Sequence, residues 1–221
     1  SRSCRTALRW QLWRPSSYWL IAFLLVFIGY RSVTYSVRNY PAYGVPSAIE
    51  DAYEYIQANA NPGAVVLAAD PEVNMRVRNV APVYVYVPSG YGTFVTTTEI
   101  LQRAAEMMHF FGIIPEEMLG YQQGDDPLRR PFARGLMIPE SYLFNGSLKY
   151  PTFPARHQAV QDAYDSSDTG ALTYPADIIW VGPYERDLGR ASLDDQEGLE
   201  LIYRNESVNL YQVTSRDALV W

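Results

Sequence analysis

Cysteine and histidine are scarce in this chain, and their scarcity excludes several classes of protein. The 221 residues contain one cysteine and two histidines. One cysteine excludes a disulfide framework and a cysteine-based zinc site, and two histidines argue against a histidine-rich metal centre. We therefore expect neither a metal nor a cofactor. At 48% hydrophobic and 19% charged residues, the composition is typical of a globular domain.

Positive charge is also in short supply, and it is unevenly placed. The formal net charge is −6 and the isoelectric point is about 5.0, which argues against nucleic acid as the main partner. Residues 1–46 contain six arginines and no acidic residue, whereas residues 47–221 contain the other 12 basic residues and all 24 acidic ones. The chain thus joins a basic arm to an acidic domain.

An uncharged apolar run covers residues 15–30, between Arg14 and Arg31. As a helix it spans about 24 Å, less than the ~30 Å hydrocarbon layer of a bilayer, and continuing it to about residue 37 makes it long enough. Tryptophan and tyrosine at both ends match the aromatic belts of membrane helices. We therefore predict a transmembrane helix over residues 15–37. Its expected anchor residues are Trp13, Trp19, Leu20, Phe23, Leu24, Phe27 and Tyr30.

The charges that flank this run predict its orientation. Four arginines precede it, so the positive-inside rule places residues 1–14 in the cytoplasm. Residues 38–46 then form a linker, and residues 47–221 form a domain on the periplasmic or extracellular side. This prediction makes the chain a single-pass protein of the cell membrane, with the lipid bilayer as its first partner.

Three alternatives to a transmembrane helix remain open. A buried core helix leaves the aromatic and arginine flanks unexplained. A cleaved signal peptide needs a small-residue cleavage site, which is missing after Tyr30. A lipoprotein anchor needs a cysteine after the apolar run, and Cys4 precedes it. The first residue, a serine, is compatible with removal of methionine or with a fragment of a longer protein.

Hydrophobic periodicity and turn residues predict an α/β fold for residues 47–221. The expected elements are a helix that begins at a capping box of Ser47 and Glu50, strands over residues 64–69 and 82–87, a helix from a capping box of Thr96 and Glu99 to Gly112, a helix near residues 155–165, a strand over 177–182, and a hairpin of 199–204 with 207–213. The predicted fold class is α/β: a single N-terminal transmembrane helix followed by a small mixed-sheet α/β sandwich domain, partly parallel with an antiparallel edge.

Two positions at strand ends are candidates for binding a ligand. Asp70 follows the first strand, where a catalytic carboxylate lies in many α/β sheets, although Asp-Pro is also an ordinary strand exit. Ser89, Gly90 and Gly92 form a loop between a strand and a helix, but the sequence there is neither a Walker loop nor a dinucleotide fingerprint. A plain turn is the alternative.

The rest of the sequence offers no catalytic constellation. His109 lies on an apolar helix, where a hydrogen-bonded or half-buried histidine is expected, and His157 is expected to be exposed. Neither accompanies a serine elbow, so a hydrolase triad has no support. Residues 113–154 contain six prolines and four glycines and are expected to be an irregular excursion, which is usually functional or disordered.

The candidate contacts with a partner lie in that excursion. Arg129, Arg130 and Arg134 could pair with acidic partners or lipid head groups. Other membrane-protein subunits are the expected partners.

Two stretches of the domain carry a resemblance to a known family: residues 176–186 read ADIIWVGPYER and residues 201–213 read LIYRNESVNLYQV. Together they resemble the C-terminal extracytoplasmic region of polytopic membrane proteins of the GT-C glycosyltransferase type. The resemblance implies sugar-transfer machinery that uses lipid-phosphate-linked donors, with a glycan or a lipid-linked sugar as a possible ligand. The family's catalytic acid lies in an early loop between transmembrane helices, so no catalytic residue carries over.

Two functions follow from these observations. In the first, the chain is an accessory or scaffold subunit of a larger membrane complex and is not catalytic by itself. In the second, it is the terminal helix and outer domain of a GT-C-like glycosyltransferase. Whether the chain is an enzyme stays open at this point, and the sequence favours the first function.

Overall fold

The computed structural model describes residues 26–27, 45–90, 94–116, 139–144, 149–150, 152–167, 171–188 and 192–215. The chain divides into two compact units, residues 1–44 and 45–221. In the first unit, Val26 and Phe27 are helical. All other described residues belong to the second unit, which carries the candidate sites.

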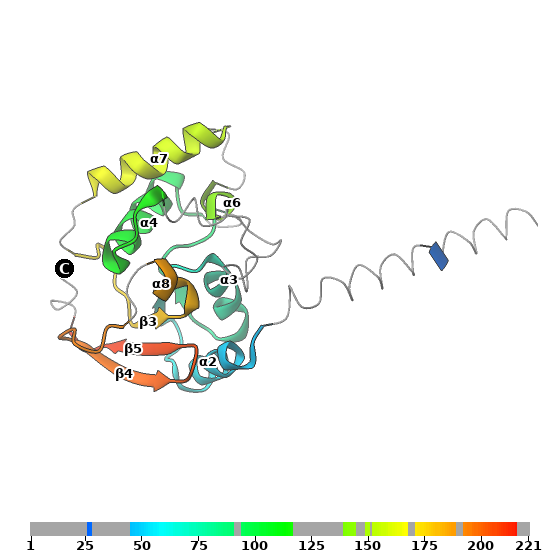
Figure 1. Cartoon of the computed structure of the whole chain (residues 1–221), viewed down its shortest axis with the longest axis vertical. Helices are drawn as coiled ribbons and strands as arrows, with labels where there is room; N and C mark the ends of the chain where they lie inside the picture. The colour runs from blue at the N-terminus through cyan, green and yellow to red at the C-terminus, as the bar shows by residue number, and fades with distance from the viewer. Residues whose placement is uncertain are drawn as a thin grey trace, which may run out of the picture. The chain divides into compact units, whose positions relative to one another are not determined.

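A mixed sheet of five strands forms the centre of the second unit (Figure 1). Its strands are β1 (Val65–Leu67), β2 (Tyr84–Val85), β3 (Ile178–Val181), β4 (Leu199–Arg204) and β5 (Asn209–Val213), in the order β2-β1-β3-β5-β4. β1 pairs in parallel with β2 and β3, whereas β5 pairs antiparallel with β3 and β4. The mixed α/β prediction, with its antiparallel hairpin at one edge, is confirmed.

The alternation of side chains in β3 divides the core into two layers. Ile178 and Trp180 point to one face of the sheet, and Ile179 and Val181 point to the other. All four are buried, which is why this strand reads as a continuous apolar run.

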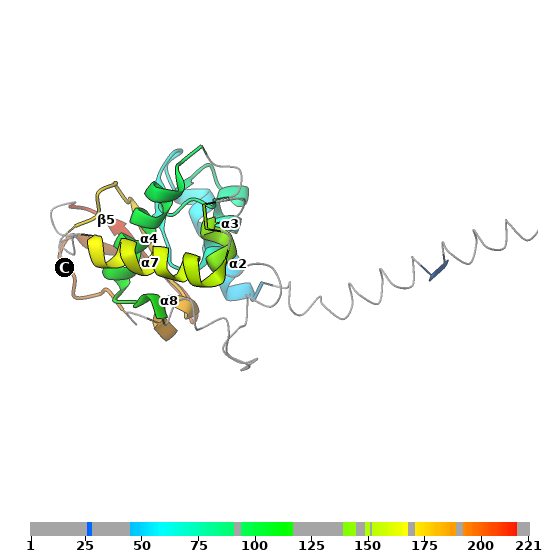
Figure 2. The ribbon, with the colours of Figure 1, turned by 90° about the horizontal axis from the view of Figure 1, so that it is seen from above.

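Helices cover both faces. α2 (Ser47–Asn59) and α3 (Pro71–Val80) contribute to the layer that contains Trp180. α4 (Thr97–Phe111), α6 (Pro139–Phe144) and α7 (Phe153–Ser166) contribute to the opposite layer, and Figures 1 and 2 show α7 running alongside α4. A short helix, α8 (Pro183–Leu188), follows β3 directly.

Local capping signals predicted α4 well. The Thr96 hydroxyl accepts a hydrogen bond from the backbone N–H of Glu99, and the helix ends at Gly112 with a left-handed φ of 69°. The Glu99 side chain forms an ion pair with Arg103 rather than the reciprocal hydrogen bond of a capping box.

Three predictions of secondary structure were wrong or incomplete. Ser47 does not cap α2, because the N-cap residue is Pro46 and no side chain caps this helix. The strands over 64–69 and 82–87 are shorter than predicted. The sequence analysis also missed α3 and α8, because both begin at a proline that was interpreted only as the end of a strand. Proline is favoured in the first turn of a helix, where its missing N–H costs nothing.

Candidate functional site

The carboxyl ends of β1 and β3 meet at the edge where open α/β sheets bind their ligands. β1 lies between β2 and β3, so the chain passes to opposite sides of β1 as the sheet is built, which makes this point a topological switch. Asp70 follows β1, and Glu185 lies in α8, just after β3. The fold therefore brings the predicted residue Asp70 beside a carboxylate 115 positions further along the chain.

Both carboxylate oxygens of Glu185 accept hydrogen bonds from backbone N–H groups. Its Oε1 accepts hydrogen bonds from the backbone N–H groups of Ala69 at 2.8 Å and Asp70 at 2.9 Å, and its Oε2 accepts from that of Gly182 at 3.0 Å. The residue is completely buried. Its carboxylate thus joins the end of β1 to the turn after β3.

Asp70 also makes a structural hydrogen bond. Its Oδ1 accepts from the backbone N–H of Glu72 at 2.8 Å and so caps α3. Burial, together with the neighbouring Glu185 carboxylate, raises the pKa of Asp70 to about 8. Burial raises the pKa of Glu185 as well. The Asp70 carboxyl group therefore largely retains its proton at neutral pH.

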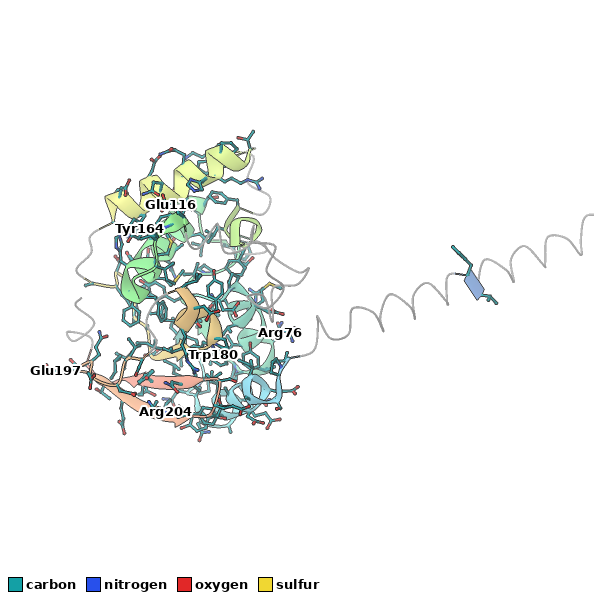
Figure 3. All side chains as sticks on the ribbon, viewed as in Figure 1. Arg76, Glu116, Tyr164, Trp180, Glu197 and Arg204 are labelled. Carbon is teal, nitrogen blue, oxygen red and sulfur yellow. The ribbon has the colours of Figure 1, made fainter. Side chains whose placement is uncertain are left out.

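Among the described residues, the cavity that Asp70 lines is small. Tyr53, Trp180 and Pro183 help to enclose a cavity of about 10 Å³, roughly the minimum for a single water molecule. The rings of Tyr53 and Trp180 stack with their centroids 5.2 Å apart, and Figure 3 shows Trp180 inside the domain near α8. In the described part of the chain, the ligand-binding edge of the sheet is packed like a core.

The tight turn after β3 requires the absence of a side chain at Gly182. A Cβ atom there would lie 2.6 Å from Trp180 Nε1 and 3.3 Å from Glu185 Oε2. The sequence analysis missed Glu185. A usable signal was present, since a glutamate three residues after Gly182, at the start of a helix led by Pro183, is placed to accept from the Gly182 N–H as it does here.

The predicted ligand loop packs against α6. Ser89 is buried, and the N–H of Gly90 donates to the carbonyl of Tyr142 at 2.8 Å. A Cβ on Gly90 would lie 2.7 Å from the carbonyl oxygen of Leu143. Gly90 therefore allows a close backbone approach inside the domain. Gly92 lies outside the described residues.

An open pocket lies elsewhere, between α4 and α7. Its volume is about 460 Å³, within the usual range for small-molecule sites. Leu101 and Ala159 are buried at its base, while Gln102, Asp162 and Thr173 line it and are exposed. The sequence analysis did not predict this pocket, because it depends on the packing of two helices.

A buried carboxylate, Glu106, organises this pocket. Its Oε1 accepts from the side chains of Gln102 at 3.0 Å and Thr173, and its Oε2 accepts from the Tyr86 hydroxyl and from the backbone N–H of Thr173 at 3.2 Å. Four donors saturate the carboxylate. Glu106 thus fixes the positions of Gln102 and Thr173, and burial together with this hydrogen bond raises the pKa of Tyr86.

The two histidines have different surroundings from each other. His109 is half-buried; its Nε2 lies 3.0 Å from the carbonyl oxygen of Tyr164, and its ring stacks on that of Tyr164. The prediction for His109 is confirmed. His157 was expected to be exposed and is half-buried.

Most of the other predicted residues lie outside the described part of the chain. This holds for Arg129, Arg130 and Arg134, and for every predicted anchor residue except Phe27, whose exposed fraction is 48%. Within the residues that the structure describes, no helix is both long and apolar enough to cross a bilayer. The described side chains also contain no cluster of three or more potential metal ligands.

Comparison with known proteins gives no relative. The chain matches no protein family, no curated protein and no solved structure. The resemblance to GT-C proteins therefore stays a prediction, and functional inference rests on the geometry above.

Proposed function

We propose that this chain is a membrane-anchored accessory or scaffold subunit of a larger membrane complex and catalyses no reaction by itself. In this proposal, residues 15–37 cross the cell membrane and the α/β domain lies on the extracytoplasmic side. Other membrane-protein subunits are its partners.

The observation that carries the proposal is the closed edge of the sheet. A catalytic carboxylate must reach within hydrogen-bond distance of its substrate. Asp70 caps α3 and Glu185 accepts three backbone hydrogen bonds, and the cavity that Asp70 lines with other described residues has a volume of about 10 Å³. The carboxyl groups at this edge hold the fold together, which supports a domain that acts through its surface.

The charge distribution also supports a role in association. Residues 47–221 carry twice as many acidic as basic residues, 24 against 12. Such a domain attracts basic surfaces and repels acidic ones, which increases the rate and the selectivity of association.

Purification of the full chain from its native membranes in a mild detergent tests the proposal. We expect other membrane proteins to co-purify in a fixed ratio and to cross-link to this chain. A stable monomer without co-purifying proteins would contradict the proposed role.

Single substitutions test where the partner binds. Arg129→Ala, Arg130→Ala and Arg134→Ala are expected to reduce co-purification, since these arginines are the predicted contacts. Arg78→Ala is the matched control, because Arg78 is an exposed arginine of α3 and should leave co-purification unchanged. Equal yields from all four variants would exclude this segment as the contact.

A further inference from the structure

We propose that the pocket between α4 and α7 binds an organic cation, a protonated amine or a guanidinium group. This inference goes beyond the scaffold role and does not depend on it. It rests on the hydrogen-bonding character of the groups that line the pocket.

The polar side chains around Glu106 donate their hydrogen-bonding protons to other groups of the protein. Gln102 Nε2 donates to Glu106 and to the Thr173 hydroxyl, and that hydroxyl donates to Glu106. An amide whose nitrogen is turned towards Glu106 has its oxygen turned away from it. Gln102 and Thr173 therefore offer a ligand acceptor oxygens rather than donor groups.

The end of α7 has the same character. Ser166 donates its hydroxyl proton to the carbonyl of Ala163, and Ser167 donates its own to the carbonyl of Tyr164. Their oxygens keep only lone pairs for a ligand. The last turn of α7 contains no basic residue, so α7 itself supplies no cation to the negative end of its dipole.

Formal charge adds to this preference. Glu106 and Asp162 line the pocket, and Lys149 is the one basic side chain among the residues that line it. The Lys149 ammonium lies over the Tyr150 ring at 5.2 Å. A cation supplies donors together with positive charge, whereas an anion would meet mostly oxygen acceptors, and the hydroxyl groups of a neutral polyol could donate but would bring no charge to balance the carboxylates. The ammonium group and the guanidinium group are donors without acceptor capacity.

Two matched carboxylates on α7 make the proposal testable. Asp162 accepts a hydrogen bond from Gln158 at 2.8 Å, and Asp165 accepts one from Gln161 at 2.9 Å; all are i,i+4 pairs at the surface. Asp162 lines the pocket, and Asp165 is not among its lining residues. Asp162→Asn and Asp165→Asn therefore make the same chemical change inside and outside the pocket.

The experiment is calorimetric titration of the full chain, in a neutral detergent at low ionic strength, with agmatine. Agmatine carries a guanidinium and an ammonium group. We expect binding with a dissociation constant of about 1 mM or below. Asp162→Asn should weaken it about fivefold, as removal of one nearby surface charge predicts, and Asp165→Asn should leave it nearly unchanged.

Lys149→Gln reports the sign of the ligand's charge. If the ligand is a cation, removing this ammonium group should strengthen agmatine binding about twofold to fivefold. Equal weakening by Asp162→Asn and Asp165→Asn, or weaker binding in Lys149→Gln, would overturn the proposal. So would binding of methyl glucoside or inorganic phosphate in place of agmatine.

A second probe distinguishes the two possible sources of the cation, an arginine side chain of a partner protein and a free diamine. N-acetyl-arginine amide presents the guanidinium group as a protein side chain does. Binding as tight as that of agmatine would identify the cation as an arginine of a partner protein, whereas a tenfold preference for agmatine would identify a free diamine. Each of these results supports a cation site, and both remain interpretable if no subunit co-purifies with the chain.

Discussion

Two buried glutamates, Glu185 at the carboxyl edge of the sheet and Glu106 on α4, are held by different kinds of hydrogen-bond donor. Glu185 is completely buried and accepts three hydrogen bonds from backbone N–H groups. Glu106 is 3% exposed and accepts three of its four from side chains, at the base of an open pocket. Backbone donors bind Glu185 to the fold itself. Side-chain donors allow Glu106 to position groups that face solvent.

This comparison indicates which carboxylate serves the fold and which shapes a surface. Glu185 lines neither of the two cavities described above, whereas Glu106 lines the pocket of about 460 Å³. Water cannot replace Glu185 without opening the core, whereas water from the pocket can reach the partners of Glu106. The predictions below test this difference.

Removal of Glu185 is expected to have the largest effect. Glu185→Ala leaves three buried N–H groups without an acceptor, and we expect the free energy of unfolding to fall by about 3–5 kcal/mol. Chemical denaturation followed by circular dichroism measures the change. The control is Glu197→Ala, since Glu197 is exposed (Figure 3), and a surface change of this kind alters stability by about 0.5 kcal/mol or less. Similar losses in the two variants would mean that the hydrogen bonds of Glu185 to the ends of β1 and β3 do not stabilise the fold.

Stability should also fall as the pH rises. The folded pKa of Asp70, about 8, lies above its ordinary value of 3.8, so between these values the folded state keeps a proton that the unfolded state releases. Ionising Asp70 in the folded state therefore lowers the free energy of unfolding. This loss is absent below about pH 4 and complete above about pH 8, and between these values the free energy of unfolding falls by about 1 kcal/mol per pH unit. Glu185, whose pKa is raised as well, adds to the change in the same direction.

The groups that face Asp70 include one cation. Tyr53 on α2, Glu72 and Arg76 on α3, and Glu185 on α8 lie around it. Asp70→Asn keeps a side chain that can cap a helix and removes the titrating group. Denaturation of this variant between pH 5 and 8 should show a much flatter dependence on pH. An unchanged slope would show that groups other than Asp70 control the pH dependence of stability.

Removal of Glu106 is expected to have the smallest of these effects. Glu106→Ala frees donors on Tyr86, Gln102 and Thr173, and water in the pocket can satisfy part of them. We expect a loss of about 1–2 kcal/mol, since a donor that reaches water does not pay the full penalty of burial. Denaturation under the same conditions as for Glu185→Ala gives the comparison. A loss as large as that of Glu185→Ala would show that the pocket is closed to water.

Much of the fold could be predicted from local patterns. Thr96 and Gly112 mark the two ends of α4 through contacts within a few residues. The apolar runs identified β1 and β3, and the hairpin of β4 and β5 was predicted close to its observed bounds. These signals are local, so no knowledge of distant residues is needed to interpret them.

The candidate sites could be predicted only in part, because their contacts are distant in sequence. Asp70 was identified at a strand end, but its environment depends on Glu185, 115 residues away. Glu106 lies among alanines and methionines of a helix, and its partner Thr173 is 67 residues further on. The local pattern of Gly182, Pro183 and Glu185 indicates one of the hydrogen bonds of Glu185, to the Gly182 N–H, but its contacts with β1 and the partners of Glu106 outside α4 have no local signal.

The sequence by itself determined the α/β class, the ends of α4, the buried strands with their apolar runs, and the division into a basic arm and an acidic domain. Only the tertiary structure decided that, among the described residues, Asp70 lines a cavity of just about 10 Å³ and that a larger pocket opens between α4 and α7. Strand and helix patterns depend on neighbouring residues, whereas the space left around a carboxylate depends on side chains brought together from opposite ends of the domain.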